Sequence, residues 1–344
     1  MVKKLIYILL ITVIMIGMRV SAQDVQFSQY YAAPLYLNPA LAGINQIGRA
    51  GINYRSQWPG VDASFETFSA YIDNNWDEKN SSLGLLFTSD LAGIGSLRAT
   101  EVALQYAYQA RLNPFWTFRP AFQVSYASRS IDYTRLIFGD QLDNNGLTGN
   151  PTNESFAGNS TSYFDLGLGG IVFSEQSWLG LAVHHLLEPN QSLGTGTSEL
   201  PRKISIHGGY KIPLRTDYKR GETASGKEKS VSPTFNYKAQ GQFQQLDLGA
   251  YFTYSPVIFG MWYRGIPLTK NIANGSNSEA IIAMIGLTRN QFNFGYSFDY
   301  TLSDLGISSG GAHEISMTYT FRIGDPRKPS RNVRELRCPV PYMF

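Results

Sequence analysis

Apolar and polar residues alternate along most of the chain, from about Arg49 to Arg322. The clearest case is 291–301, where every even position is aromatic and every odd position is polar or glycine. Because successive side chains of a strand point to opposite faces, this period predicts strands with one apolar and one polar face. Comparable alternation occurs at 101–111, 164–172, 246–254 and 313–322.

These segments predict an all-β fold of about fourteen strands, since no helical period of similar length competes with them. Together they make one domain, 49–322. We place the strands at 49–57, 63–72, 82–89, 98–111, 115–128, 161–173, 177–187, 202–212, 231–239, 242–254, 257–265, 279–289, 291–301 and 312–322.

Three features favour a transmembrane antiparallel β-barrel over a soluble β-sandwich, whose strands also alternate. Many segments reach about ten residues, the length that a tilted strand needs to cross the hydrocarbon core. The apolar face is rich in aromatic residues, and the opposite face carries mainly Gly, Ser, Asn, Gln and Asp. Lipid offers no partner to an open strand edge, so the sheet is expected to close.

Connection lengths predict how this barrel sits in an outer membrane. Tight joints fall at Asn113-Pro114, Glu175-Gln176, Ser255-Pro256 and Asn290, and long ones at 129–160, 188–201, 266–278 and 302–311. In this class, short turns face the periplasm and long loops face the exterior. An even number of strands then places the segment 23–48 and the tail 323–344 in the periplasm. The long 213–230 connection, also expected there, breaks the pattern.

The first 22 residues predict an export signal. Lys3 and Lys4 precede an apolar run from Leu5 to Ile16, and Val20-Ser21-Ala22 places small residues before the expected cleavage site. A membrane anchor is the competing interpretation, but the run is shorter than the roughly 20 residues of a span. We expect a mature chain that begins at Gln23, in the outer membrane of a Gram-negative cell.

Composition adds two constraints. The formal net charge of +3 comes from Lys3, Lys4 and Arg19 of the signal, so the remainder is neutral and gives no reason to expect a nucleic acid. Cys338 is the single cysteine, so an internal disulfide is excluded. Only 16% of the residues are charged, against about a quarter in an average soluble domain.

Candidate catalytic and metal-binding residues are weak, and we expect no enzyme activity, no cofactor and no metal. His184 and His185 are adjacent in a strand, so we expect them to point to opposite faces and not to share one metal ion. Asp140 and Asp143 lie in a long loop, without the spacing of a calcium-binding loop. Cys338 lacks a partner for redox chemistry.

A motif follows the predicted signal. Its residues are Gln26-Phe27-Ser28-Gln29-Tyr30, then Asn38-Pro39-Ala40 with Gly43, then Tyr54-Arg55 with Gln57-Trp58. In order, spacing and position, this motif resembles the opening of the PorP/SprF family. The resemblance implies a non-enzymatic outer-membrane protein of the type IX secretion and gliding system of Bacteroidetes.

The resemblance also implies partners. These are outer-membrane lipid, secreted surface adhesins with a C-terminal sorting domain, and periplasmic ring or peptidoglycan-anchoring subunits. One departure concerns the end of the chain. Barrel proteins commonly end on an aromatic residue of the last strand, whereas here that strand is expected to end near Phe321 and a tail runs on to Phe344.

The segment 23–48 allows three interpretations. Pro34 and Pro39 exclude regular structure through it, and Asn38-Pro39 favours a turn. It can form a plug inserted in the lumen, a periplasmic docking strap, or a segment that packs under the barrel and closes its pore. Arg55 is expected either to be paired inside the lumen or to contact a partner.

Basic residues gather in two parts that are expected to be periplasmic. They are Arg215, Lys219, Arg220, Lys227 and Lys229 in the 213–230 connection, and Arg322, Arg327, Lys328, Arg331, Arg334 and Arg337 near the end of the chain. They are either solvated charges or a docking face for an acidic periplasmic subunit.

We therefore predict a type IX outer-membrane component that recruits, helps to export or anchors a secreted surface protein and couples to periplasmic ring subunits. The alternative is an outer-membrane transport barrel for small hydrophobic molecules, because about fourteen strands with an N-terminal plug also suit such channels. A soluble exported β-sandwich is the third possibility.

Overall fold

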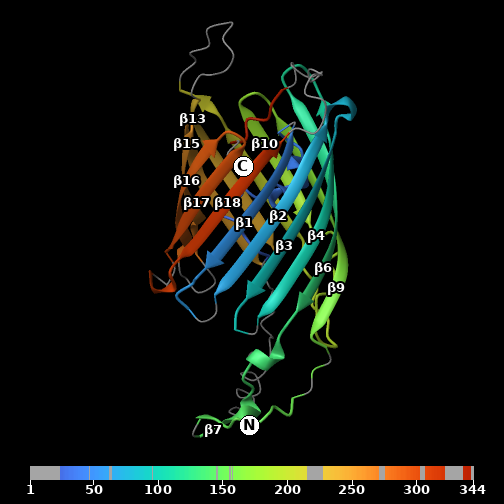
Figure 1. The fold of residues 1–344 in the computed structure, drawn as a ribbon, viewed down its shortest axis with the longest axis vertical. Coiled ribbons are helices and arrows are strands. Elements are labelled where there is room, and N and C mark those ends of the chain that lie inside the picture. The colour runs from blue at the N-terminus through green and yellow to red at the C-terminus, as the bar shows by residue number, and fades with distance from the viewer. Residues whose placement is uncertain are drawn as a thin grey trace, which may run out of the picture.

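A closed antiparallel barrel of fourteen long strands forms the part of the protein that the computed structural model describes (Figure 1). Each strand pairs with its neighbours in chain order, and β18 pairs with β1 to close the sheet. The prediction of an all-β antiparallel barrel is thus confirmed. The described residues are 24–45, 47–61, 64–94, 96–144, 146–154, 156, 158–214, 228–270, 276–302, 307–321 and 336–341.

All fourteen predicted segments overlap one of these long strands. The long strands are β1 (Gly48–Gln57), β2 (Phe65–Trp76), β3 (Ser81–Ala92), β4 (Leu97–Tyr108), β6 (Thr117–Ser130), β9 (Ser160–Phe173), β10 (Ser177–His184), β11 (Lys203–Tyr210), β13 (Lys229–Gln240), β14 (Phe243–Tyr254), β15 (Val257–Lys270), β16 (Ser276–Arg289), β17 (Phe292–Thr301) and β18 (Ala312–Phe321).

Short elements complete the described fold. Two-residue strands β5 (Ala110–Arg111) and β12 (Ile212–Pro213) extend the barrel wall, and β7 (Leu142–Asp143) pairs with β8 (Gly146–Leu147) in a loop. The helices are α2 (Pro34–Leu37), η1 (Pro39–Leu41), η2 (Asp77–Lys79), η3 (Tyr133–Arg135), η4 (Gly139–Gln141) and η5 (Ile307–Ser309). None of these described helices has the length and apolar character of a membrane span.

The apolar stripe of the strands faces outward and the polar stripe faces the lumen. On β4, Leu104 is 54% exposed, whereas the next residue, Gln105, is fully buried. On β17, Phe294 is 45% exposed and Ser297 is fully buried. A soluble sandwich would bury the apolar stripe between its sheets, so this arrangement fits a barrel whose outer surface contacts lipid.

The two ends of the barrel differ in their connections. At one, which we call the turn end, tight turns join β9 to β10 and β14 to β15. At the other, the loop end, lie the connections 131–159 and 185–202. In Figure 1, the connection 131–159, which we call the arm and which carries β7, stands well clear of the barrel below the loop end.

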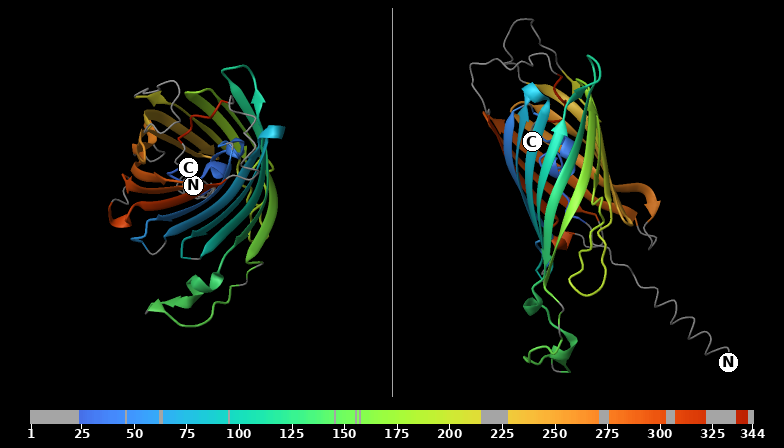
Figure 2. Two further views of the ribbon diagram at one scale, coloured as in Figure 1. Left: turned by 45° about the horizontal axis from the view of Figure 1, so that its top comes forward. Right: turned by 90° about the vertical axis from the view of Figure 1, so that its right-hand side faces the viewer.

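Residues 24–45 occupy the lumen, where the blue segment lies within the ring of strands (Figure 2). Asp24 contacts Gln240 at the loop end, whereas Gly43 contacts Asp73 near the turn end, where β1 begins. Residues 336–341 lie at the turn end, where Pro339 and Pro341 border one cavity with the β14–β15 turn. The segment 23–48 and the tail 323–344 were expected at the same end of the barrel. This expectation is wrong for Asp24, because residues 24–45 run the length of the lumen and place Asp24 at the loop end.

Candidate functional site: the occupied lumen and its loop-end vestibule

Asp24 fixes the start of the lumenal segment to the barrel wall. Its carboxylate accepts a hydrogen bond from Lys203 Nζ at 2.7 Å and lies 2.7 Å from His185 Nε2. The backbone N–H of Asp24 donates to Gln240 Oε1, and Gln240 Nε2 donates back to the carboxylate, both at 3.0 Å. On the far side of the imidazole, Asp165 Oδ2 lies 2.6 Å from His185 Nδ1. We call this cluster the latch.

Electrostatics keep the latch charged. Burial alone would lower the pKa of His185, but the carboxylates of Asp24 and Asp165 raise it from 6.5 to about 9. Burial alone would raise the pKa of Asp24, but Lys203 and His185 hold it well below 3.8. A protonated imidazole between two carboxylates donates from both ring nitrogens, so the latch is an ionic contact at neutral pH.

Ser28 joins the lumenal segment to a buried ionic cluster on the wall. Its hydroxyl donates to Asp299 Oδ2 at 2.5 Å and accepts from Arg55 Nη1 at 2.8 Å and Arg264 Nη2 at 2.9 Å. Arg55 and Arg264 also each donate to Asp299 Oδ2 at 2.9 Å. A hydroxyl has one donor and two acceptor positions, so Ser28 uses all of them.

The same cluster receives the backbone of the lumenal segment. Glu314 accepts the backbone N–H groups of Ser28 at 2.7 Å and Gln29 at 3.1 Å. The side chain of Gln29 donates to Ser297 Oγ and accepts from Ser316 Oγ. All of these groups are buried, and the hydrogen bonds offset part of the cost of removing the charges from water; Arg55 Nε and Asp299 Oδ1 have no hydrogen-bond partner among the described residues.

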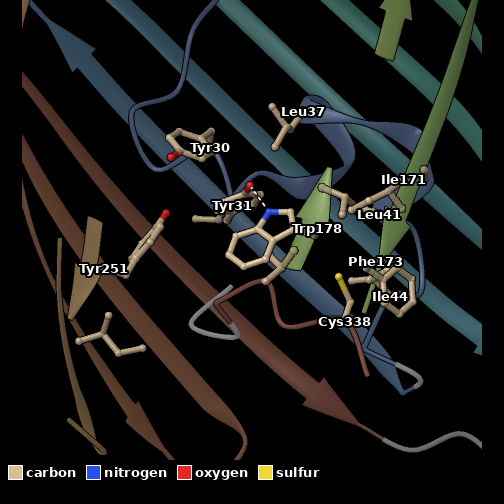
Figure 3. Close-up of a cluster of buried hydrophobic side chains, with 14 of the residues drawn as sticks. Tyr30, Tyr31, Leu37, Leu41, Ile44, Ile171, Phe173, Trp178, Tyr251 and Cys338 are labelled. Carbon is tan, nitrogen blue, oxygen red and sulfur yellow. Dashed lines mark hydrogen bonds between the residues drawn. The ribbon is translucent and has the colours of Figure 1, made fainter. Parts of the chain in front are cut away.

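An aromatic core follows along the segment. The indole N–H of Trp178 donates to Tyr31 Oη at 2.6 Å, as Figure 3 shows, and that of Trp262 donates to Tyr30 Oη at 3.1 Å. Tyr251 packs edge-on against Trp262 with 4.6 Å between ring centroids. The hydroxyls of Tyr30 and Tyr31 and the indole N–H groups of both tryptophans are thus paired, as suits aromatic residues that fill a polar lumen.

Asn38 forms the turn that the sequence predicts at Asn38-Pro39. Its Oδ1 accepts the backbone N–H of Ala40 at 2.9 Å and so caps η1, and its Nδ2 lies 3.1 Å from His207 Nε2. Gly169 on the facing wall makes room for this turn, since a Cβ there would lie 2.2 Å from Asn38 Oδ1. A wall glycine is thus required by the close approach of the segment.

The segment ends in a second ionic contact near the turn end. The backbone N–H of Gly43 donates to Asp73 Oδ2 at 2.7 Å, and Arg49 Nη2 binds the same oxygen at 2.6 Å. Gly43 has φ +63°, and a Cβ would lie 2.6 Å from that of Ser82, so both conformation and space favour glycine. Arg119 Nε donates to the carbonyl of Ala40 at 3.2 Å.

Residues 336–341 pack against this core from the turn end. Cys338 is 1% exposed and lies in one buried cluster with Ile44 and Phe173, beside them in Figure 3. Burial raises the pKa of its thiol from 9.0 to about 12. Arg337 is exposed, whereas the other predicted docking residues, Arg215, Lys219, Arg220, Arg327, Lys328, Arg331 and Arg334, lie outside the described residues.

The structure brings most of the motif together. Phe27 packs edge-on against Tyr36 inside the lumen, and Gln57 Oε1 accepts from Arg55 Nη2 at 3.0 Å. Tyr54 differs, because it belongs to the outward face of β1 and is 42% exposed. Trp58, with φ +57°, packs edge-on against Phe65 at the loop end.

Two expectations about other residues need comment. His184 and His185 do not point to opposite faces, because β10 ends at His184 and the backbone of His185 has φ +59°. Both side chains are buried, with ring centroids 6.4 Å apart. Among the described residues, no group of three or more His, Cys, Asp or Glu side chains is arranged to hold a metal ion.

Several lumenal residues escaped the sequence analysis. They are Asp24, Asp73, Arg49, Arg119, Asp165, His207, Asp247, Arg264, Asp299 and Glu314. A signal was present, because a charged residue on the inward stripe of a strand is expensive to bury unless it has a partner. The partners lie far away in sequence, however, so the alternation could not identify them.

A cavity of about 460 Å³ lies between the lumenal segment and the loop end. We call it the vestibule. Asp24, Val25 and Gln26 border it on the side of the lumenal segment. Its other lining residues are Arg55, Gln57, Trp58, Phe65, Thr67, Asp90, Ala92, Leu97, Ala99, Arg129, Tyr163, His185, Gln191, Leu200 and Phe243.

The chain is weakly similar to several solved outer-membrane proteins. The toluene transporter TodX of Pseudomonas putida aligns with a TM-score of 0.44 at 10% identity, covering 89% of this chain and 96% of that one. The CymD monoaromatic hydrocarbon channel aligns at 0.45 and 11%, covering 85% and 93%. The outer membrane protein Omp33 of Acinetobacter baumannii aligns at 0.41 and 8%, covering 82% and 100%. At these values we draw no functional conclusion from them.

Sequence comparison is more decisive. A search of curated proteins gives no match. The family model for the type IX secretion system membrane protein PorP/SprF matches residues 19–319, which include the whole motif and nearly the whole barrel. This match confirms the resemblance noted from the motif and places the barrel in an outer membrane. The chain belongs to the PorP/SprF family of type IX secretion system membrane proteins.

Proposed function

We propose that this outer-membrane barrel is a non-enzymatic platform of the type IX machinery, which recruits, helps to export or anchors a secreted surface protein and couples to periplasmic ring subunits. The observation that carries the proposal is the occupied lumen. Residues 24–45 run through it and residues 336–341 pack against them. A barrel filled by its own chain offers surfaces at its two ends rather than a path for an exported polypeptide.

The loop end is the surface that we assign to the secreted partner, with the loop end outside the cell. The arm is folded there, because Tyr133 stacks on Phe156 with 3.9 Å between ring centroids. Leu142 and Leu147, which pair across the β7–β8 hairpin, are 53% and 62% exposed. Exposed apolar side chains on an ordered hairpin favour contact with a protein.

The turn end is the surface that we assign to the periplasmic ring. Phe321 and Leu336, the described residues on either side of the basic stretch near the chain end, both belong to this end of the barrel. Leu214 and Glu228, which flank Arg215, Lys219, Arg220 and Lys227 of the 213–230 connection, also lie at the turn end. An acidic periplasmic subunit would be attracted to such charges. Residues 1–22 act as the export signal in this proposal.

Site-specific labelling tests the orientation. We expect a cysteine at Leu142 to react with a membrane-impermeant maleimide on intact cells. The matched control is Gln176→Cys in the exposed β9–β10 turn, which should react only after the outer membrane is permeabilised. Labelling of the Gln176 variant alone on intact cells would reverse the assignment of the two ends.

Co-purification tests the partners. Purification of the membrane complex should recover a secreted protein with a sorting domain or periplasmic ring subunits. Replacing Arg322, Arg327, Lys328, Arg331, Arg334 and Arg337 with Gln should reduce recovery of the ring subunits without affecting the secreted protein. Equal recovery of ring subunits from this variant would remove the basic docking face from the proposal.

The alternative of a transport barrel for small hydrophobic molecules finds less support. Such a path needs an apolar binding pocket or a side opening. The inner wall instead buries charged groups such as Arg119, Arg264 and Asp299, and the vestibule is bordered by Arg55, Asp90 and Arg129. Uptake of a hydrophobic substrate that depends on this barrel in whole cells would restore the alternative.

A further inference from the structure

One lateral row of inward-facing residues crosses the barrel wall near the loop end. Cross-strand pairing places Glu314 beside Arg55, Arg55 beside Thr67, Thr67 beside Asp90, Asp90 beside Ala99, and Ala99 beside Arg129. The row therefore joins β18, β1, β2, β3, β4 and β6 at one level. Charged residues of both signs alternate along it: Glu314 and Arg55 are direct neighbours, Thr67 separates Arg55 from Asp90, and Ala99 separates Asp90 from Arg129.

The first part of this row already binds a polypeptide. Glu314 accepts the backbone N–H groups of Ser28 and Gln29, and Arg55 donates to the hydroxyl of Ser28. These contacts hold a non-regular stretch of the lumenal segment against the wall. The row is thus a surface on which a length of chain is fixed by charged side chains.

The second part of the row borders the vestibule and is not used in this way. Among the described residues, Asp90 is bonded to the hydroxyl of Thr67 at 2.7 Å and forms no salt bridge, although the charge of Arg129 acts on it along the row. Arg129 is bonded to the amide of Gln191 and likewise forms no salt bridge within the described residues. Gln26, on the side of the lumenal segment, has no hydrogen-bond partner for its side-chain amide in the same described set.

The spacing of these charges defines a recess. Ala99 lies between Asp90 and Arg129 in the row. Because its side chain is only a methyl group, a recess remains between the two longer side chains. Adjacent strands are about 4.8 Å apart, so the two charged residues are about 10 Å apart across the recess. Side chains on one face of an extended chain repeat every ~7 Å. Long charged side chains can span the difference between this repeat and the separation of Asp90 and Arg129.

We propose that the vestibule binds an extended polypeptide segment that carries a basic and an acidic side chain two residues apart, with the basic group on Asp90 and the acidic group on Arg129. The inference rests on the proposed function, since the segment would belong to the secreted partner held at the loop end. A polypeptide is favoured because the same row already fixes one. A neutral ligand would leave Asp90 and Arg129 each without a salt bridge in a partly enclosed site.

A peptide-binding measurement tests the proposal on the purified full-length barrel in nanodiscs. The probe is a fluorescent octapeptide of glycine and serine with one lysine and one aspartate two positions apart. Three analogues replace the lysine by glutamine, the aspartate by asparagine, or both. We expect the doubly charged peptide to bind about tenfold or more tightly than the neutral one at low salt, as two charge pairs at a partly buried surface predict.

Variants assign each charge. Asp90→Asn should abolish the preference for lysine and keep that for aspartate, and Arg129→Gln should do the reverse. The control replaces Lys211 and Glu228, an ion pair at the opposite, turn end of the barrel, and should leave binding of the peptide unchanged. Equal binding of all four peptides, no binding by any, or variants that keep both preferences would overturn the proposal. Unchanged heat-modified gel mobility checks that each variant folds.

A cell experiment separates this inference from the proposed function. Loss of the whole protein should remove a secreted protein from the cell surface, as measured by surface proteomics. Suppose that this loss is seen, but that cells carrying both Asp90→Asn and Arg129→Gln keep the secreted protein at the normal level. The vestibule proposal is then wrong, while the proposed function stands. If loss of the whole protein leaves the surface proteins unchanged, the proposed function itself is wrong.

Discussion

Ser28 and Arg55, 27 positions apart in the sequence motif, meet in the lumen, where Arg55 Nη1 donates to Ser28 Oγ at 2.8 Å. The contact explains why the motif spans the start of the lumenal segment and the first strand. The segment supplies a small hydroxyl, and the strand supplies the charge. Both are then fixed by Asp299 on β17.

Replacing Ser28 with alanine should loosen the lumenal segment. The change leaves Arg55, Arg264 and Asp299 each without one hydrogen bond in a buried site. We expect a loss of about 1–3 kcal/mol in the free energy of unfolding, measured by urea titration of the barrel in vesicles. Ser192→Ala, in an exposed loop, is the control and should change little. An unchanged Ser28 variant would mean that the ionic cluster holds without the segment.

Alkaline pH should release the latch. The folded pKa of His185 is raised, so its contribution is complete below 6.5, declines as the pH rises towards about 9 and is lost above it. The folded pKa of Asp24 is lowered, so its contribution is present above 3.8 and is lost only in strong acid. Among the described residues, the other charged or titratable groups that act on the pair are Lys203, Asp165, His184, Glu101, Asp90, Tyr36 and Tyr163.

Conductance in planar bilayers measures this release. Openings should be rare between pH 5 and pH 7, where we expect the latch to be charged, and become frequent above about pH 9, as the imidazolium is lost. His185→Gln cannot titrate, so its opening frequency should be the same at both ends of the range. The same alkaline rise in that variant would contradict the role of His185.

Gly169 should be intolerant of a side chain. Alanine there places a methyl group on Asn38 Oδ1, so the cap of η1 must move. We expect a loss of about 1–3 kcal/mol in the free energy of unfolding, as for other overpacked sites. Gly167→Ala is the matched control on the same inward stripe of β9, because its nearest neighbours would lie at 3.4 Å. Equal stabilities of the two variants would argue against the close approach.

Cys338 should resist alkylation while the barrel is folded. Its thiol is buried and its pKa is raised to about 12, so little thiolate forms at neutral pH. We expect iodoacetamide to label it only after unfolding in urea, as followed by mass spectrometry. A cysteine at exposed Arg337 gives the positive control in a C338S background. Rapid labelling of Cys338 in the folded protein would show that residues 336–341 leave the lumen readily.

The number and position of the strands follow from the sequence because the constraint is local. A strand in lipid must alternate along its own length, so 291–301 or 101–111 reveals its two faces without knowledge of any neighbour. The length of the segments, the aromatic content of one face and the small polar residues of the other predicted that the apolar stripe faces lipid, and Phe294 and Tyr296 are exposed on β17. Connection lengths distinguished the two ends of the barrel for a similar reason, because the length of a connection is also read along the chain without knowledge of any neighbour.

The content of the lumen was decided by the tertiary structure alone. Asp24 binds residues 161 to 216 positions away, and Ser28 binds Asp299 at a separation of 271. No local period encodes such pairs, since any inward polar residue satisfies the alternation equally well. The register between neighbouring strands, from β1 to β6, brings Arg55, Asp90 and Arg129 into one row. The sequence therefore determined the strands of the barrel wall and their two faces. Folding into a closed barrel determined which lumenal residues bind one another, because buried charges must find partners across the lumen.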